Sequence, residues 1–292
     1  MTGWDPEQLW LKAKLFIDRA NQMDHSDPEF PLWSALSLEL LGRAALSRRH
    51  PVLNADRGSE DSVLYAFGVT VKNARSASAV VVFERLQALS ALSPDQVTFC
   101  RWLMDRRNRE LHTGELPFQS EGEASWLPQF YEVCAALCQD GKALRDFLGA
   151  ELENLATSLI ETRKESIRKR VLDLLSKHKA EAGDAAENAE AWRDHVAPPP
   201  STAGRGYQRR ACPACGRQGT MSGARLRERA PEYTEGTVQF VVEYQTDSFK
   251  CDACFLTLTG LSEALAAGLE PRFDVAVEGE PEPREFIEYG DM

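Results

Sequence analysis

Apolar side chains recur at steps of three and four residues through most of the first 180 positions of the chain. This spacing places them on one face of an α-helix, so it predicts a bundle of amphipathic helices. Ser, Asp and Pro residues at the starts of several segments suit helix N-termini. We expect helices over about residues 5–24, 32–49, 78–89, 93–113, 125–149 and 149–179, with a short one near residues 62–67. The fold class is therefore mainly α, with a long helix at the C-terminal end of the bundle.

The composition changes after this helical region. Residues 181–208 are rich in Glu, Ala and Asn and then in Pro, which is typical of an inter-domain linker. Farther on, residues 237–244 are rich in β-branched and aromatic side chains and predict a strand. We therefore divide the chain into a helical domain (residues 1–180), the linker, a small β domain (209–270) and an acidic tail (271–292). The tail either is disordered or folds back over the arginines of the β domain.

Composition narrows the class of protein. Of the 292 residues 43% are hydrophobic, which is ample for a buried core, and the formal net charge is −11. This acidic balance argues against a protein that coats nucleic acid, but a local basic site is compatible with it. The N-terminus lacks a secretory signal, and no apolar run reaches the roughly 18 residues of a membrane span. We predict a cytoplasmic protein that does not bind membranes.

Two C-x2-C pairs carry the strongest chemical signal. Four of the seven cysteines form them: Cys212, Cys215, Cys251 and Cys254. Four thiolates suit one tetrahedral Zn²⁺ in a closed structural site, which predicts a zinc ribbon without a catalytic metal. The 35 residues between the pairs imply an inserted β-hairpin. A redox role for the pairs is the weaker alternative, and Cys134 and Cys138 read as core thiols.

A second candidate site lies at the end of the helix over residues 93–113. Arg107, Asn108 and His112 combine a phosphate-binding guanidinium, an orienting amide and an imidazole that exchanges protons near neutral pH. Asn108 and His112 share a helix face, whereas Arg107 is about 140° away from His112 on an ideal helix. Arg106 is the alternative arginine. A solvated basic helix end is the simplest alternative for the whole motif.

The motif Arg107-Asn108-x-x-x-His112 resembles the R-x(4–6)-H signature of the HEPN superfamily (higher eukaryotes and prokaryotes nucleotide-binding domains). An early helix of that family often carries an E-x-x-x-K/R pair, and Glu39 and Arg43 match it here. For this pair we nevertheless favour an ordinary surface ion pair. The resemblance covers about residues 30–160 and implies a HEPN-like helical bundle.

The same resemblance implies a function. Many HEPN members are metal-independent endoribonucleases, so it implies a toxin or antiviral-defence enzyme that cleaves RNA to 2′,3′-cyclic phosphates. It also implies a homodimer that places two signatures in one cleft, and a protein partner that neutralises or activates the enzyme. His112 would act as general acid or base, Arg107 would stabilise the phosphate, and Asn108 would position His112, with Glu39 and Arg106 in support.

The alternative from a different class is a non-catalytic dimeric adaptor whose zinc ribbon binds RNA or a partner protein. Seven arginines against one acid in residues 205–229 suit phosphate contact or simply a soluble surface. Seven basic residues between Arg163 and Lys179 suit a solvated helix face, an RNA-facing face or a dimer-spanning arm.

Overall fold

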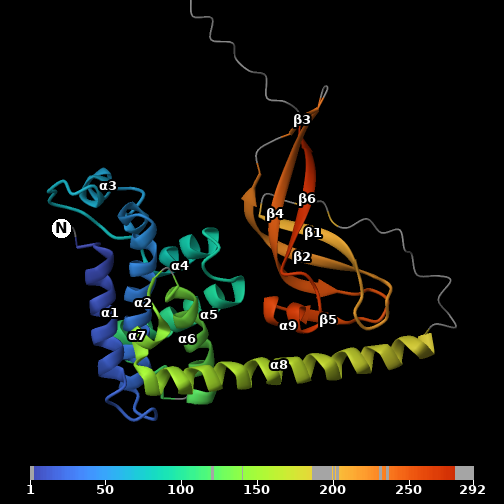
Figure 1. Ribbon diagram of the computed structural model, residues 1–292, viewed down its shortest axis with the longest axis horizontal. Helices are drawn as coiled ribbons and strands as arrows, with labels where there is room; N and C mark the ends of the chain where they lie inside the picture. Colours follow the sequence, from blue (N-terminus) through green and yellow to red (C-terminus); the bar gives the residue numbers. More distant parts are fainter. Residues whose placement is uncertain are drawn as a thin grey trace, which may run out of the picture.

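The computed structural model describes residues 3–119, 122–139, 141–185, 199, 201, 204–229, 232–234 and 237–279. These residues form two units, a helical unit and a small antiparallel sheet (Figure 1). The helical unit contains α1 (Pro6–Ala20), α2 (Glu29–Arg49), η1 (Pro51–Asn54), α3 (Glu60–Ala66), α4 (Ala79–Ala88), α5 (Pro94–His112), α6 (Glu123–Leu137), α7 (Leu144–Leu148) and α8 (Ala150–Ala185). The predicted mainly α class is thus confirmed.

The helix starts follow from capping chemistry. An Asp5 carboxylate oxygen accepts hydrogen bonds from the Glu7 and Gln8 N–H groups, each at 3.0 Å, and Pro6 occupies the first helical position. Ser93 and Gln96 form a reciprocal capping box at the start of α5. These caps satisfy N–H groups that would otherwise have no partner, so both predicted starts are confirmed.

Helix α2 lies at the centre of the helical unit. It contacts α1, α4, α5 and α6, and Leu38 and Leu41 are completely buried. Gly42 allows α4 to approach α2 closely, because a Cβ atom there would lie 3.0 Å from the ring of Phe83 on α4.

The single helix predicted over residues 125–149 is wrong. The structure has α6 and α7 there, separated by a turn in which Gly141 has φ +85°. Gly149, also at φ +85°, separates α7 from α8. Both angles are incompatible with a right-handed helix, and glycine adopts them without steric cost.

The second unit, called the ribbon unit here, is one antiparallel sheet with a short helix. Its elements are β1 (Arg205–Ala211), β2 (Gln218–Glu228), β3 (Glu232–Thr234), β4 (Thr237–Lys250), β5 (Thr257–Thr259), α9 (Leu261–Ala266) and β6 (Arg272–Gly279). The strand order is β1-β2-β4-β3, and β5 and β6 also pair with β4. The long β2–β4 pairing is the hairpin expected between the two cysteine pairs.

The sheet extends beyond the boundaries expected from sequence. β1 begins inside the predicted linker, and β6 takes the first part of the predicted tail into the sheet beside β4. Helix α8 also continues past residue 180, because alanine and glutamate there favour the helix. Residues 186–198 of the predicted linker and residues 280–292 of the predicted tail lie outside the described residues.

Helix α8 contributes to the cores of both units. Its first half packs Ala156 and Ile160 against the core of the helical unit. Its second half places Val171, completely buried, in a separate core with Phe249 and Leu258 of the sheet. Figure 1 shows α8 running from the helical unit along the ribbon unit, with α9 above it. The apolar residues predicted along this helix therefore pack against the helical unit in its first half and against the ribbon unit in its second half.

Candidate functional site

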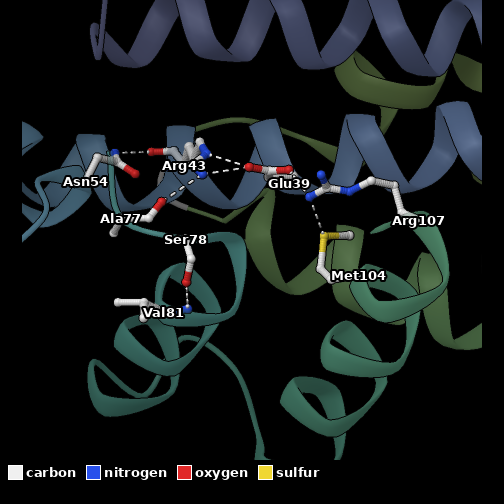
Figure 2. A network of polar contacts seen from close by, with 8 residues as sticks. All are labelled: Glu39, Arg43, Asn54, Ala77, Ser78, Val81, Met104 and Arg107. Carbon is white, nitrogen blue, oxygen red and sulfur yellow. Dashed lines mark hydrogen bonds and ion pairs between the residues drawn. The ribbon is translucent and has the colours of Figure 1, made fainter. Parts of the chain in front are cut away.

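The carboxylate of Glu39 joins two arginines that are distant in sequence. Arg43 binds one carboxylate oxygen with Nε at 3.0 Å and with Nη2 at 2.6 Å. Arg107, 68 residues from Glu39, binds the other oxygen through its own Nη2. Figure 2 shows Glu39 between the two guanidinium groups, with the sulfur of Met104 beside Arg107. The two parts of the sequence resemblance thus meet in one network.

This network is largely shielded from solvent. The exposed fractions of the side chains are 11% for Arg43, 17% for Glu39 and 14% for Arg107. The interpretation of Glu39–Arg43 as an ordinary surface ion pair is therefore wrong. The reason is tertiary, because the face of α2 that carries the pair is covered by α5 and by the segment before α4.

The segment before α4 and the end of η1 hold Arg43 in place. The Ala77 carbonyl accepts a hydrogen bond from Arg43 Nη2 at 2.9 Å. Asn54, completely buried, donates to the Arg43 carbonyl at 2.9 Å and to Ser47 Oγ at 2.8 Å. Sequence reasoning missed Asn54, whose local sequence carries no signal for this contact.

The network has more positive than negative charge. Two guanidinium groups share one carboxylate, which gives a formal charge of +1. Arg43 Nη1 and Arg107 Nε are buried and have no hydrogen-bond partner among the described residues. The network thus carries one more cation than anion, and its two unpaired nitrogens are shielded from solvent.

Arg106 has a different role from its neighbour. Its guanidinium lies 4.0 Å from the ring centroid of Trp102, one turn back on α5. It therefore stacks on an aromatic ring, whereas Arg107 points to Glu39. The structure separates the two arginines that the sequence left as alternatives.

Asn108 and His112 are both exposed on the last two turns of α5. The helix remains regular up to His112, and Thr113 then caps it by donating its N–H to the Arg109 carbonyl at 3.0 Å. The helical angle of about 140° between Arg107 and His112 is therefore retained. Within a single chain, the His112 imidazole and the Asn108 amide lie on one side of α5 and the Arg107 guanidinium lies on another. A single chain therefore does not bring the three groups together.

The four cysteines of the C-x2-C pairs do come together. Their Sγ atoms all lie within 4.8 Å of one another, with Cys212 and Cys254 at 3.6 Å and Cys215 and Cys251 at 3.7 Å. These separations are far longer than a disulfide bond of about 2.05 Å. They approach the edge of about 3.8 Å that a tetrahedron has when Zn–S is about 2.3 Å. Burial raises the pKa of the Cys212 thiol to about 11, and a bound cation would stabilise its thiolate.

Two tight turns present these thiols. The first lies between β1 and β2, where the Gly216 N–H donates to the Cys212 carbonyl at 2.9 Å and Gly216 has φ +74°. The second lies between β4 and β5, and Phe255 takes the equivalent position with φ +59°. His178 of α8 lies on the second turn, with Nδ1 2.7 Å from the Cys254 carbonyl oxygen. Sequence reasoning missed His178, because it is 76 residues away from Cys254.

The remaining cysteines are core thiols, as predicted for Cys134 and Cys138. Cys100, Cys134 and Cys138 are free and buried in the helical unit. Burial raises the pKa of Cys138 to about 12.

The arginines of the ribbon unit are mostly neutralised within the chain. Arg205 pairs with Asp247 at 2.8 Å and Arg210 with Glu270 at 2.7 Å. Three more pairs are Arg225–Glu228, Arg227–Glu243 and Arg229–Asp274. Asp274 lies in the predicted tail, so part of that segment does fold back over the arginines. Phosphate binding by this surface loses support, because these ion pairs compensate the local excess of positive charge.

The seven basic residues of α8 are also paired in part with acidic residues. Arg163 pairs with Glu132 at 3.5 Å, Lys164 with Glu161 at 2.9 Å and Arg168 with Glu165 at 2.9 Å. Arg170 pairs with Glu263 of α9. Several of these pairs are exposed, which agrees with the solvated-face interpretation.

Comparisons with models of protein families, with curated proteins and with solved structures find no match for this chain. Among the described residues, no helix has both the length and the apolar content that crossing a membrane requires.

Proposed function

We propose that the protein is a metal-independent endoribonuclease of the HEPN type, acting in toxin or antiviral-defence systems. The 2′-OH of the RNA attacks the adjacent phosphate and leaves a 2′,3′-cyclic phosphate and a 5′-OH. The protein supplies proton transfer and charge stabilisation, which typically contribute factors of 10²–10⁴ and more. The active form is a homodimer, and the substrate is RNA.

The observation that carries the proposal is the position of Arg107 beside the Glu39–Arg43 pair. A guanidinium held by a shielded carboxylate has few rotamers left, so little entropy is lost when it binds a phosphate oxygen. The formal charge of +1 that remains in the network also favours an anion there. Glu39 binds only one edge of Arg107, and the guanidinium offers further N–H donors.

His112 performs the proton transfer and Asn108 orients it. Both lie on the exposed side of α5, where a substrate has access. A second copy of α5, related by a two-fold axis, would add the arginine of one chain to the histidine of the other. In this arrangement Arg107 and His112 of the same chain, which lie on different sides of α5, do not need to meet.

The four-thiol cluster is a structural Zn²⁺ site in this proposal. Four cysteine ligands fill a tetrahedral shell, so no position is open for a substrate or water. The metal stabilises the ribbon unit and takes no part in the cleavage.

The test is RNA cleavage by purified full-length protein without added divalent ions. Substitution His112→Ala removes the proton-transfer group, so cleavage should fall by a factor of at least about 10². The control is His25→Ala, in the loop between α1 and α2, which should keep wild-type cleavage. A folded His112→Ala protein that cleaves as fast as the wild type contradicts the proposal. An unreactive 2′-deoxy nucleotide at the cleavage site should block the reaction, because the nucleophile is then missing.

A second candidate is a non-catalytic dimeric adaptor. It is favoured by the compensation of the Arg107 charge by Glu39 and by the separation of Arg107 and His112 on α5. An adaptor would leave total RNA intact at every protein concentration and still form a dimer. The same cleavage assay therefore separates the two functions.

A further inference from the structure

The four-thiol cluster of the ribbon unit is in contact with α8. Nδ1 of His178 lies 2.7 Å from the Cys254 carbonyl oxygen, and the exposed fraction of the His178 side chain is 16%. A carbonyl oxygen only accepts hydrogen bonds, so the imidazole donates its Nδ1–H to it. The Glu181 carboxylate is farther from the same nitrogen, at 3.4 Å. Helix α8 therefore contributes a hydrogen-bond donor to the backbone of a metal-binding turn.

The face of α8 that carries His178 packs in the core of the ribbon unit. The other members of this face recur at steps of three and four residues, which keeps them on one side of the helix. They share one buried cluster with three of the four thiols, those of Cys212, Cys251 and Cys254. These members are Ile167, Val171, Leu174, Leu175 and Ala182. His178 is the polar member of the face, and it meets the sheet at the second cysteine pair.

The two metal-binding turns differ at one backbone position. Gly216 has φ +74° in the first turn, and glycine adopts this angle without steric cost. Phe255 takes the same position in the second turn with φ +59°, a conformation that crowds the Cβ atom of an L-residue. The carbonyl that His178 binds belongs to the peptide between Cys254 and Phe255, so its direction is linked to this angle. The strained turn is therefore the one that receives a hydrogen bond from α8.

We propose that His178 is a positioning residue of the metal site, and that its hydrogen bond holds the second turn in the conformation that directs Cys251 and Cys254 to the metal. The inference rests on the structural Zn²⁺ site proposed above and is independent of RNA cleavage. Groups that hydrogen-bond to the ligands of a metal commonly change its affinity by factors of about 10–100. Because such coupling is reciprocal, a bound metal in turn stabilises the packing of α8 on the ribbon unit.

The test measures the zinc affinity of the full-length protein by competition with a chromophoric chelator. His178→Ala removes the donor, so the dissociation constant for Zn²⁺ should rise by a factor of about 10–100. His178→Asn places an amide nitrogen close to the position of Nδ1 and should recover most of the affinity. Asparagine is a weaker helix former than alanine, so this recovery cannot arise from helix propensity.

The matched control is Lys177→Ala, at the preceding position of α8. The exposed fraction of the Lys177 side chain is 67%, and its partner Glu181 lies 3.9 Å away. This substitution also introduces alanine into the second half of α8, but it removes no contact with the thiol cluster. The dissociation constant for Zn²⁺ should therefore stay at the wild-type value.

A second experiment links His178 to the strained position. Phe255→Gly relieves the crowding at the positive φ angle, so the second turn then needs less support from α8. In this background the loss of zinc affinity caused by His178→Ala should be at least about threefold smaller than in the wild type, because residues that act on one feature are not additive. An equal loss in both backgrounds contradicts the role of His178 in holding this turn.

The remaining outcomes separate this inference from the proposed function. Wild-type zinc affinity in His178→Ala, or no recovery in His178→Asn, overturns the inference and leaves both the metal site and the nuclease standing. A wild type that takes up no zinc overturns the metal site and the inference together. A wild type that loses zinc affinity through His178→Ala but cleaves no RNA supports the inference, and the nuclease assignment alone fails.

Discussion

The Glu39 network of the helical unit and the four-thiol cluster of the ribbon unit both unite residues that are distant in sequence. In the thiol cluster every member is equivalent, and one divalent cation satisfies all four ligands. In the Glu39 network two cations share one anion, and buried nitrogens of Arg43 and Arg107 have no partner among the described residues. The first cluster is chemically complete once a metal binds. The second retains one positive charge in excess of its carboxylate.

On the function proposed above, this difference is that between a metal site that maintains the fold and a site that binds a substrate. A closed tetrahedral shell leaves nothing for a substrate, so its contribution is stability. A shielded network with unsatisfied donors lowers the stability of the fold. Proteins retain such networks mainly where a function requires them. Two predictions test this contrast, and a third concerns the contact between the two units. They are given from the largest expected effect to the smallest.

Removal of one thiol should have the largest effect. Cys212→Ser, or a strong chelator on the wild type, should abolish metal binding and unfold the ribbon unit, because apparent zinc-binding energies of about 10–16 kcal/mol are available to such modules. Amide hydrogen exchange should accelerate across β1–β6 and the second half of α8, where Val171 loses its core. The rest of the helical unit, including the first half of α8, should keep its protection against exchange.

The control for this prediction is Cys138→Ala, a buried cysteine of the helical unit that should leave the metal content at one ion per chain. Unchanged exchange in the ribbon unit of a metal-free protein would show that the sheet folds without the ion.

Loss of the shared carboxylate should have the next largest effect. Glu39→Gln leaves two shielded guanidinium groups without an anion, so the free energy of unfolding should fall by about 3–5 kcal/mol. Chemical denaturation measures it. Asp18→Asn is the matched control, because it removes an exposed pair with Lys14 at 3.3 Å and should cost less than about 0.5 kcal/mol. Equal effects of the two substitutions would mean that the Glu39 network is no more than a surface ion pair.

The smallest effect concerns the contact between the two units. Asp95 of α5 accepts a hydrogen bond from the Ser262 N–H of α9 at 3.2 Å, and Gly260 leaves space for its carboxylate. Burial raises the pKa of Asp95 above its ordinary value, and hydrogen bonds from Ser262 and Leu261 only partly offset this. The folded protein therefore binds this proton more tightly than the unfolded chain does. The resulting stability is fully present below the ordinary pKa and is lost as pH rises through the folded pKa.

Unfolding free energies of the wild type and Asp95→Asn, measured from about pH 3 to 7, should therefore diverge in a defined direction. The wild type should lose stability relative to the variant as pH rises. Asp24→Asn is a control with the opposite pH dependence, because hydrogen bonds from Ser26 lower the pKa of Asp24. There the wild type should gain stability relative to the variant as pH rises. A pH-independent difference for Asp95→Asn would show that the carboxyl is solvated in the folded protein.

Local sequence determined much of the fold. Helix starts at Asp5 and Ser93 were predictable because caps act over three residues, and the C-x2-C pairs were predictable because each turn is built from adjacent positions. The break between α6 and α7 was missed, because the apolar spacing continues through a glycine turn whose positive φ overrides it. The strand β6 was missed because its residues were assigned, together with the acidic residues that follow them, to a tail. Pairing with β4 makes them part of the sheet.

The sequence by itself thus singled out the candidate residues: four thiols in two pairs, and an arginine, an asparagine and a histidine on one helix. Only the tertiary structure decided what each of them touches. Packing of α2 against α5 buries Glu39 with Arg107, and stacking on Trp102 turns Arg106 to a different side. Side-chain spacing along a helix is a local property, whereas burial and charge compensation depend on elements that the chain brings together from far apart.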